Sequence, residues 1–356
     1  MRKIATLAIA TMAGCAVYPA MAQSNVTLYG IIDTGVARID NVNGSNVNLL
    51  RSGNLLTSRF GFRGTEDLGG GLKAIFNLEA GLSSDTGATN TPFFNRQSWV
   101  GLGSDNLGEL KMGRMLPTIN DVFVASLNAS WLGNSTSALD GAGVGAGSSA
   151  ARFNNMIGGT RVDNAIKYQT PSMSGFKIHA MTAFGEVAGA SSAGRILSLG
   201  GSYASKNIEA GLVYHERNCA EAGGCAAGKD KDKILGVGGA YLVNGARYGA
   251  FYTRQKNALN VRGNDADVLS LLARVPLNGT SWVLGGGFQY LNDKTALNQD
   301  VRQFNLAANY LLSKRTQLYA LYSHQTVKNG GKAGMYSTTS STDKQNQFGV
   351  GITHTF

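Results

Sequence analysis

Histidine is the residue type best suited to acid–base chemistry, but the histidines of this sequence form no recognisable catalytic arrangement. Its four histidines are spread over separate segments, and Glu216, the acid beside one of them, would lie on the opposite face of a strand. The sequence contains no G-x-S-x-G motif, no metal-ligand spacing and no phosphate-binding loop. These features disfavour an enzyme. The histidines are His179, His215, His324 and His354.

Arginines offer a second kind of chemistry, the attraction of anions. They fall on the face of two-sided segments that is opposite the aromatic and branched apolar side chains, as Arg96 does relative to Trp99 and Arg161 relative to Val162. Arginine or lysine side chains that line a pore favour anions. The arginines assigned to this polar face are Arg59, Arg63, Arg96 and Arg161.

Two acids and one further arginine complete the set of candidate site residues. Asp121 and Asp140 lie in the longest connection of the chain, and we expect them to face the arginines and to set up a field across the pore. Arg114 has the opposite parity and shares a face with Leu110 and Met112. We expect Arg114 to serve a contact between subunits.

The segments that carry these side chains alternate apolar and polar residues with period two. In the last ten residues, Phe348, Val350, Ile352 and Phe356 share one face, interrupted by His354. Such a strand lies between two different media, and about ten residues suffice for a tilted strand to cross a bilayer. We expect an all-β fold, a 16-stranded antiparallel transmembrane β-barrel, because lipid tolerates no open sheet edge. The strands lie near residues 25–38, 55–66, 71–83, 94–103, 108–116, 161–170, 175–186, 196–205, 207–217, 233–243, 246–256, 267–275, 280–291, 301–312, 315–326 and 346–356.

The connections between these strands alternate in length. Tight turns such as Asn244-Gly245 alternate with longer polar loops, one of them at residues 39–54, as in barrels with short periplasmic turns and long extracellular loops. The third long loop, from Pro117 to Thr160, is expected to fold into the barrel and narrow it, with an extracellular flap as the alternative. A soluble β-sandwich would also alternate, but the uniform strands and alternating loop lengths disfavour it.

The first 22 residues have the features of a secretory signal. Arg2 and Lys3 precede an apolar run, and Ala20-Met21-Ala22 forms a small-residue cleavage site. Lipoprotein cleavage at Cys15 is the disfavoured alternative, since it would leave a very short apolar core. We therefore expect a signal peptide at residues 1–22 and a transmembrane β-barrel domain at residues 23–356.

Composition narrows the partners of the exported chain. Without the signal, 30 basic and 22 acidic residues remain, which gives a net charge of +8. Export and the lack of any run of five like charges disfavour nucleic acid and leave anionic solutes or an acidic surface. No apolar stretch of 18 residues follows the signal, so no transmembrane helix is expected. For Cys219 and Cys225, close together in a polar segment, a loop disulfide is favoured over two free thiols.

Six motifs, each present once, follow one another along nearly the whole mature chain. The second motif is long and highly specific. The six motifs are Val26-Thr27-Leu28-Tyr29-Gly30 with Asp33; Ser58-Arg59-Phe60-Gly61-Phe62-Arg63-Gly64-Thr65-Glu66-Asp67-Leu68-Gly69-Gly70-Gly71-Leu72-Lys73-Ala74; Arg96-Gln97-Ser98-Trp99-Val100-Gly101-Leu102; Gly113-Arg114 before Pro117; Asn164-Ala165-Ile166-Lys167-Tyr168 with Pro171 and Gly175-Phe176; and Leu311-Leu312-Ser313-Lys314-Arg315-Thr316. With these motifs the chain resembles the general porins of β-proteobacteria, the family of the trimeric Neisseria, Bordetella and Burkholderia porins.

The resemblance implies a homotrimer in the outer membrane that passes small hydrophilic solutes by passive diffusion, with no cofactor. In similar porins, wall arginines matching Arg59, Arg96 and Arg161 face acids on an infolded third loop. The terminal Phe356 matches the aromatic read by the barrel-assembly machinery, and outer-membrane lipid and lipopolysaccharide are further expected partners. The Gly/Ala/Ser-rich half of the loop, and the lack of an arginine before His354, depart from the family pattern.

These observations predict an outer-membrane diffusion porin that prefers anions. Three alternatives belong to other classes: a substrate-specific channel, which would show an aromatic track along the lumen, a non-conducting adhesive barrel, and an outer-membrane lipase whose serine and histidine are distant in sequence. Tyrosines and tryptophans mostly share the apolar parity, which disfavours the first alternative.

Overall fold

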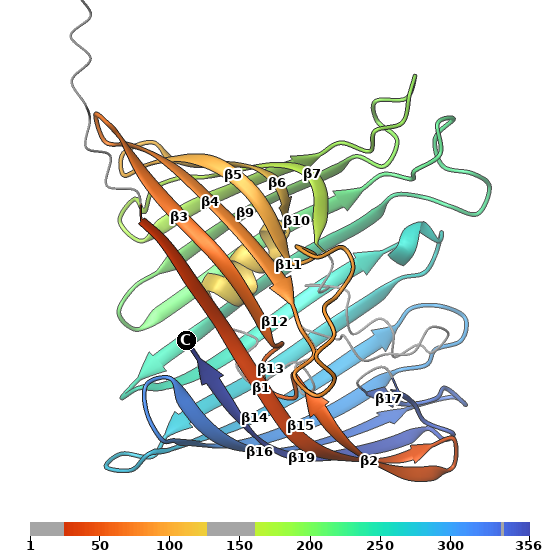
Figure 1. The fold of residues 1–356 in the computed structure, drawn as a ribbon. Coiled ribbons are helices and arrows are strands. Elements are labelled where there is room, and N and C mark those ends of the chain that lie inside the picture. Colours follow the sequence, from red (N-terminus) through yellow and green to blue (C-terminus); the bar gives the residue numbers. More distant parts are fainter. Residues whose placement is uncertain (1–24, 127–160, 336–337) are drawn as a thin grey trace, which may run out of the picture.

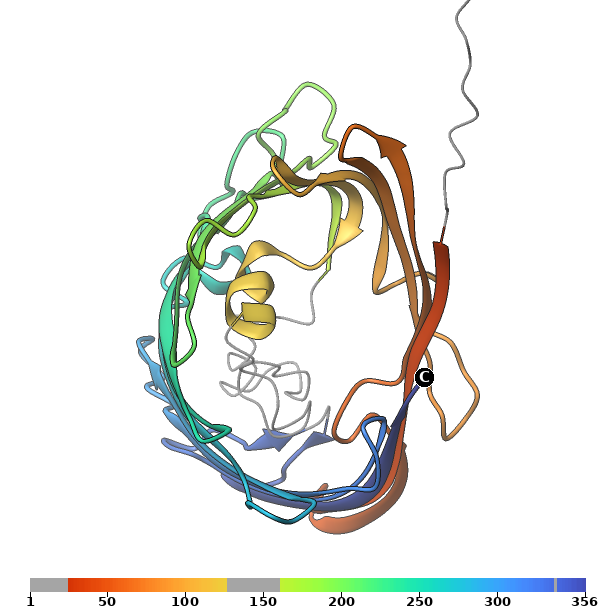
Figure 2. The same cartoon turned by 90° about the vertical axis from the view of Figure 1, so that its left-hand side faces the viewer.

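The computed structural model describes residues 25–126, 161–335 and 338–356, which form one closed antiparallel β-barrel. Figure 1 shows the barrel from the side, and Figure 2 looks along its axis. The predicted all-β barrel is confirmed. Two short strands, β17 (Gly334–Met335) and β18 (Thr338–Thr339), form a separate sheet. The strands of the barrel are β1 (Asn25–Val42), β2 (Ser45–Ser52), β3 (Arg59–Gly69), β4 (Leu72–Gly81), β5 (Gln97–Ser104), β6 (Gly108–Met115), β7 (Val162–Gln169), β8 (Phe176–Ala183), β9 (Ile196–Ala204), β10 (Ile208–Arg217), β11 (Asp232–Val243), β12 (Ala246–Lys256), β13 (Ala266–Pro276), β14 (Trp282–Asp293), β15 (Val301–Leu311), β16 (Thr316–Val327) and β19 (Lys344–Thr355).

Strand β1 closes the barrel by pairing with the last strand, β19, from Ile31 opposite Thr355 to Ile39 opposite Gln347. On its other edge, β1 pairs with β2 along its second half and with β3 along its first half. Because β2 and β3 share one place beside β1, the 17 strands of the sheet fill 16 places, the number that the sequence predicts.

The prediction of a long loop at residues 39–54 is wrong. Strand β1 continues to Val42 and β2 begins at Ser45, and the connecting residues Asn43 and Gly44 have φ angles of +50° and +83°. Positive φ at both central residues is the conformation of a tight hairpin turn, for which Asn-Gly is the preferred pair. The polar residues around this turn concealed the end of β1 and the whole of β2, and the interruption falls at residues 53–58.

Alternation sorts the side chains of each strand onto two surfaces. Phe304 of β15 is 51% exposed on the outside, whereas its neighbours Gln303 and Asn305 are 5% and 1% exposed on the inside. The inward residues bond to one another across strands, since Asn305 Nδ2 donates to Gln289 Oε1 at 2.6 Å. An apolar exterior around a polar interior is what a barrel surrounded by lipid requires.

Helical structure in the described residues is limited to short segments. The helical turn α1 (Thr118–Asn120) and the π-helical turn η1 (Asp121–Ser126) follow β6, and η4 (Ala258–Asn260) is a single 3-10 turn. Figure 2 shows α1 and η1 inside the ring of strands. None of the helices in the described part of the chain is long and apolar enough to cross a membrane.

Candidate functional site in the barrel lumen

Strands β1, β3 and β4 bring a cation, an aromatic ring and an acid together on the inner wall. The Tyr29 hydroxyl is 3.0 Å from both Asn77 Oδ1 and Glu79 Oε2. The guanidinium carbon of Arg63 lies over the Tyr29 ring, 5.2 Å from its centroid. A guanidinium stacked on an aromatic face is held in place while its donors stay available to a solute.

Arg96 reaches the same wall from the connection before β5. Its Nε donates to Glu79 Oε1 at 2.7 Å, and the two side chains are only 8% and 5% exposed. The backbone N–H of Arg96 also donates to the Glu79 carbonyl oxygen at 3.2 Å. The acid beside Arg96 is thus Glu79, a wall residue that is not among the predicted site residues.

Arg59 begins β3 next to this cluster. Its Nε donates to the Thr57 carbonyl oxygen at 2.9 Å, and its charge acts on the Glu79 carboxylate. Three arginines, Arg59, Arg63 and Arg96, share this stretch of wall with one acid, Glu79. These four side chains, called the arginine wall below, carry a net charge of +2.

A buried carboxylate holds residues 53–58 against the inside of the barrel. Asp33 is 0% exposed and accepts hydrogen bonds from Leu56 N–H at 3.0 Å, Tyr319 Oη at 2.9 Å and Thr353 Oγ1 at 2.6 Å. Its donors come from β16, β19 and the inward turn. The same acid therefore links the strands that close the barrel to the turn that leads into the arginine wall.

The first residues of the long third connection pack on the side of the barrel away from β1 (Figure 2). Ile119, Val122 and Phe123 are 2%, 0% and 0% exposed. Phe123 meets Phe251 of β12 edge to face, with ring centroids 5.7 Å apart. Apolar burial thus fixes the start of this connection inside the lumen.

Wall glycines make room for these apolar side chains. A Cβ atom on Gly236 would lie 2.8 Å from Phe123 Cε2, and one on Gly200 would lie 2.8 Å from Val122 Cγ2. Such distances are shorter than close packing allows, so any side chain at these positions would displace the connection. Together with Gly238, whose Cβ would lie 3.0 Å from Phe123 Cε1, these residues form the glycine dock.

An ion pair fastens the same segment to β7. Lys167 Nζ donates to Asp121 Oδ2 at 2.7 Å and to the Leu116 carbonyl oxygen at 3.0 Å. Lys111 is the direct cross-strand neighbour of Lys167 and pairs with Glu109 at 2.5 Å. Asp121 therefore contacts a wall lysine, and Asp140, the other predicted loop acid, lies outside the described residues.

The alternation pattern placed Trp99 and Val162 on the outer face, opposite Arg96 and Arg161, but both side chains lie on the inner face. Trp99 lies on the inner face, where Lys111 Nζ is 4.8 Å from its ring centroid. Val162 is also inside, packed in a buried cluster with Met115. Strand alternation does not predict the face of Arg96, because Arg96 precedes β5, which starts at Gln97.

A bulge explains the error at Val162. The four residues of β7 from Val162 to Ala165 lie opposite the three residues of β6 from Gly113 to Met115, and Asn164 has a φ of +55°. An inserted residue shifts the alternation on one side of the bulge relative to the other. The face of Arg161, which precedes β7, therefore cannot be read from the alternation of the strand.

Arg114 projects on the opposite face from the arginine wall. Its Nε donates to the Asn95 carbonyl oxygen at 2.7 Å, and its Nη1 donates to Asp163 Oδ1. These residues border a surface hollow with Phe93 and Phe94. A subunit contact through Arg114 stays a prediction.

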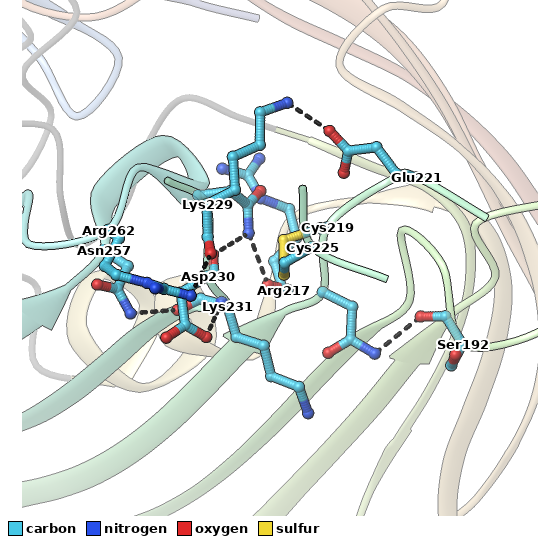
Figure 3. The surroundings of a disulfide bond; sticks show 12 residues. Ser192, Arg217, Cys219, Glu221, Cys225, Lys229, Asp230, Lys231, Asn257 and Arg262 are labelled. Carbon is cyan, nitrogen blue, oxygen red and sulfur yellow. Dashed lines mark hydrogen bonds and ion pairs between the residues drawn. A yellow bond between two sulfur atoms is a disulfide. The ribbon is translucent and has the colours of Figure 1, made fainter. Parts of the chain in front are cut away.

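Cys219 and Cys225 form a disulfide in the connection between β10 and β11, with Cα atoms 5.1 Å apart (Figure 3). The neighbouring connection bonds to this one, since Asn218 Nδ2 donates to the Ser192 carbonyl oxygen at 2.8 Å. These contacts join adjacent connections at one rim of the barrel.

The four histidines lie on four different strands, β8, β10, β16 and β19. His179 Nε2 lies 3.2 Å from Ser202 Oγ, and His324 Nδ1 lies 2.7 Å from Asn346 Oδ1. Among the residues that the structure describes, no group of three or more His, Cys, Asp or Glu side chains could hold a metal ion.

Comparison with known proteins decides the family. The family model described as Gram-negative porin matches residues 5–332. The chain belongs to the Gram-negative porin family. This porin is 33% identical to outer membrane porin protein 32 of Delftia acidovorans, and the alignment covers 100% of this chain and 99% of the relative. It is 30% identical to an outer membrane porin protein of Bordetella pertussis, covering 98% and 99% of the two chains.

Solved structures give the same assignment. The anion-selective porin from Comamonas acidovorans superposes with a TM-score of 0.77 at 28% identity, covering 94% of this porin and 100% of that chain. The trimer form of OmpT from Vibrio cholerae has a TM-score of 0.66 at 17% identity, covering 94% and 99%, and shows the shared fold alone. The porin is thus an outer-membrane channel, and the predicted family is confirmed.

Proposed function

We propose that this porin is an anion-preferring diffusion channel for small hydrophilic solutes, and that it acts without a chemical step. The arginine wall carries the proposal. Its net charge of +2 faces the lumen, and the acid at the root of the third connection, Asp121, is already paired with Lys167. A lumen lined by excess positive charge concentrates anions and repels cations.

The relatives support this direction of selectivity. The Comamonas acidovorans protein is described as an anion-selective porin, and we extend that property to this chain because the arginine wall supplies a charge of the required sign. We further propose a homotrimer, as for the trimer form of the Vibrio cholerae protein, with Arg114 at the subunit contact.

Other parts of the proposal concern export and assembly. Residues 1–22, which lie outside the described part of the chain, are proposed to be a cleaved signal peptide. Phe356 is proposed as the signal read by the barrel-assembly machinery, with outer-membrane lipid and lipopolysaccharide as surrounding partners. The third connection is proposed to narrow the lumen opposite the arginine wall.

Reversal potentials in a planar bilayer under a salt gradient test the selectivity. The wild-type porin should prefer chloride over potassium, and Arg59→Gln with Arg63→Gln should lower the permeability ratio by about twofold or more. Arg302→Gln removes the same type of charge from an exposed position of β15 and should leave the ratio unchanged. A wild-type porin that prefers potassium would contradict the proposal.

A further inference from the structure

A second basic pocket lies beside tight turns of the barrel, far along the chain from the arginine wall. It is lined by the turn before β10, the hairpin turn between β11 and β12, and the end of β13. These are tight turns, which face the periplasm in outer-membrane barrels. Of the described residues that line this pocket, three are cationic and none is acidic: Lys206, Arg247 and Arg274.

The sheet register forces two of these cations together. Arg247 and Arg274 are direct cross-strand partners of β12 and β13. Both have the inward parity, since Phe251 and Leu272 on the same faces are 1% and 6% exposed. Like charges directly opposite each other on one face of a sheet repel, so this position is unfavourable unless negative charge approaches it.

Within the described part of the chain, Glu209 offsets part of this charge. Arg247 Nη2 donates to Glu209 Oε1 at 2.9 Å, and the second nitrogen of the guanidinium contacts the other carboxylate oxygen. Among the described residues, the charges of Lys206, Arg247, Arg274 and Glu209 sum to +2. Two neighbouring guanidinium groups match the oxygens of a phosphate or carboxylate, which accept several charge-assisted hydrogen bonds at once.

We propose that this pocket, bordered by Lys206, Arg247 and Arg274, is an anion-binding site for small oxyanions at the periplasmic mouth of the channel. This inference rests on the proposed function, because a site here would hold anions that have passed the arginine wall or are about to enter the channel from the periplasm. The occupant is a soluble oxyanion and not a lipid headgroup, because the two arginines face the lumen.

Arginine modification tests binding without measuring conduction. The purified porin, in the detergent that preserves its oligomer, is treated with phenylglyoxal in the presence of increasing inorganic phosphate, and modified peptides are quantified by mass spectrometry. Phosphate should protect Arg274 with a midpoint of about 1 mM, the affinity of a weak, exchangeable site. Arg315, in an exposed turn at the same rim, is the matched control and should stay unprotected.

Two variants sharpen the binding test. Lys206→Gln, in a surface turn outside the strands, should weaken protection of Arg274 several-fold, whereas Lys314→Gln in another turn of the rim should not. Protection of Arg274 and Arg315 to the same degree, or an Arg274 that does not react even without phosphate, would overturn the proposal.

Conductance distinguishes this site from the arginine wall. At about 10 mM salt, where charges act over ~30 Å, Arg274→Gln should lower the chloride current about twofold, and at about 1 M salt the difference should vanish. A wild-type porin without anion preference, in which phosphate still protects Arg274, would refute the proposed function and keep this site. Anion preference without such protection would refute only the site.

Discussion

Removing the Phe123 ring should release the third connection from the barrel wall. The ring is 0% exposed, meets Phe251 edge to face, and fills space left by Gly236 and Gly238. Truncating a fully buried phenylalanine to alanine costs about 3 to 5 kcal/mol. If the whole cost falls on the docked arrangement, the ratio of docked to undocked molecules falls by roughly 150- to 5,000-fold. Such a change is large enough to populate an undocked connection.

Single-channel recording of Phe123→Ala is the direct assay. We expect a higher mean conductance and added current noise, because a connection that leaves the wall changes the free cross-section of the lumen from moment to moment. The barrel itself should remain folded, since its strands pair without this side chain. Migration of unheated and heated samples in gel electrophoresis checks that the variant is a native barrel.

The glycine dock supplies the reciprocal variant. Gly236→Ala keeps Phe123 but places a Cβ 2.8 Å from its ring, and overpacking of this kind costs about 1 to 3 kcal/mol. Gly201→Ala is the matched control, because a Cβ on Gly201 meets nothing within 4 Å. The reasoning fails if Phe123→Ala and Gly236→Ala both form native barrels with wild-type conductance and noise.

Further outcomes follow from contacts elsewhere in the barrel. Glu79→Gln should lower the free energy of unfolding by about 3 to 5 kcal/mol, because Arg96 would stay buried without the Glu79 carboxylate. Urea denaturation should show this loss, and an unchanged denaturation midpoint would contradict it. The same variant should raise anion preference in reversal-potential measurements. Asp33→Asn should lower the free energy of unfolding by about 2 to 4 kcal/mol, since an amide group would then face hydrogen-bond donors. Tyr319→Phe removes one of those donors and should lower it by about 1 kcal/mol. Equal effects of the two variants would show that Asp33 is not the centre of this network. Deleting Phe356 should reduce the amount of inserted trimer and leave the conductance of each assembled channel unchanged, because its backbone pairs with Gly30 at the barrel seam; normal insertion of the deletion variant would count against this role.

Local alternation was enough to predict most of the strands and the sorting of their side chains. An apolar residue at every second position has one stable arrangement between lipid and water, so Phe304 lies outside and Gln303 inside. The final strand, ending at Phe356, was predicted in the same way and pairs with β1 to close the barrel. The closure follows because an open edge cannot stand in lipid.

Alternation failed wherever the backbone departed from the regular pleat. The bulge at Asn164 reversed the face expected for Val162, and the Asn43-Gly44 turn divided what composition suggested was one loop. A single inserted residue changes the face of its neighbours but barely changes composition. Such events are set by pairing with the adjacent strand, which lies outside any local window.

The tertiary structure alone decided which charges meet. Glu79 pairs with Arg96 because the connection after β4 returns to its starting strand, and Asp121 pairs with Lys167 because the long connection enters the lumen beside β7. Likewise, Arg247 and Arg274 become neighbours only through the register of β12 and β13. Sequence alone predicted cationic side chains on the inner face, because parity is local. The pairings of these charges depend on residues that are distant in the chain and adjacent only after the barrel has closed.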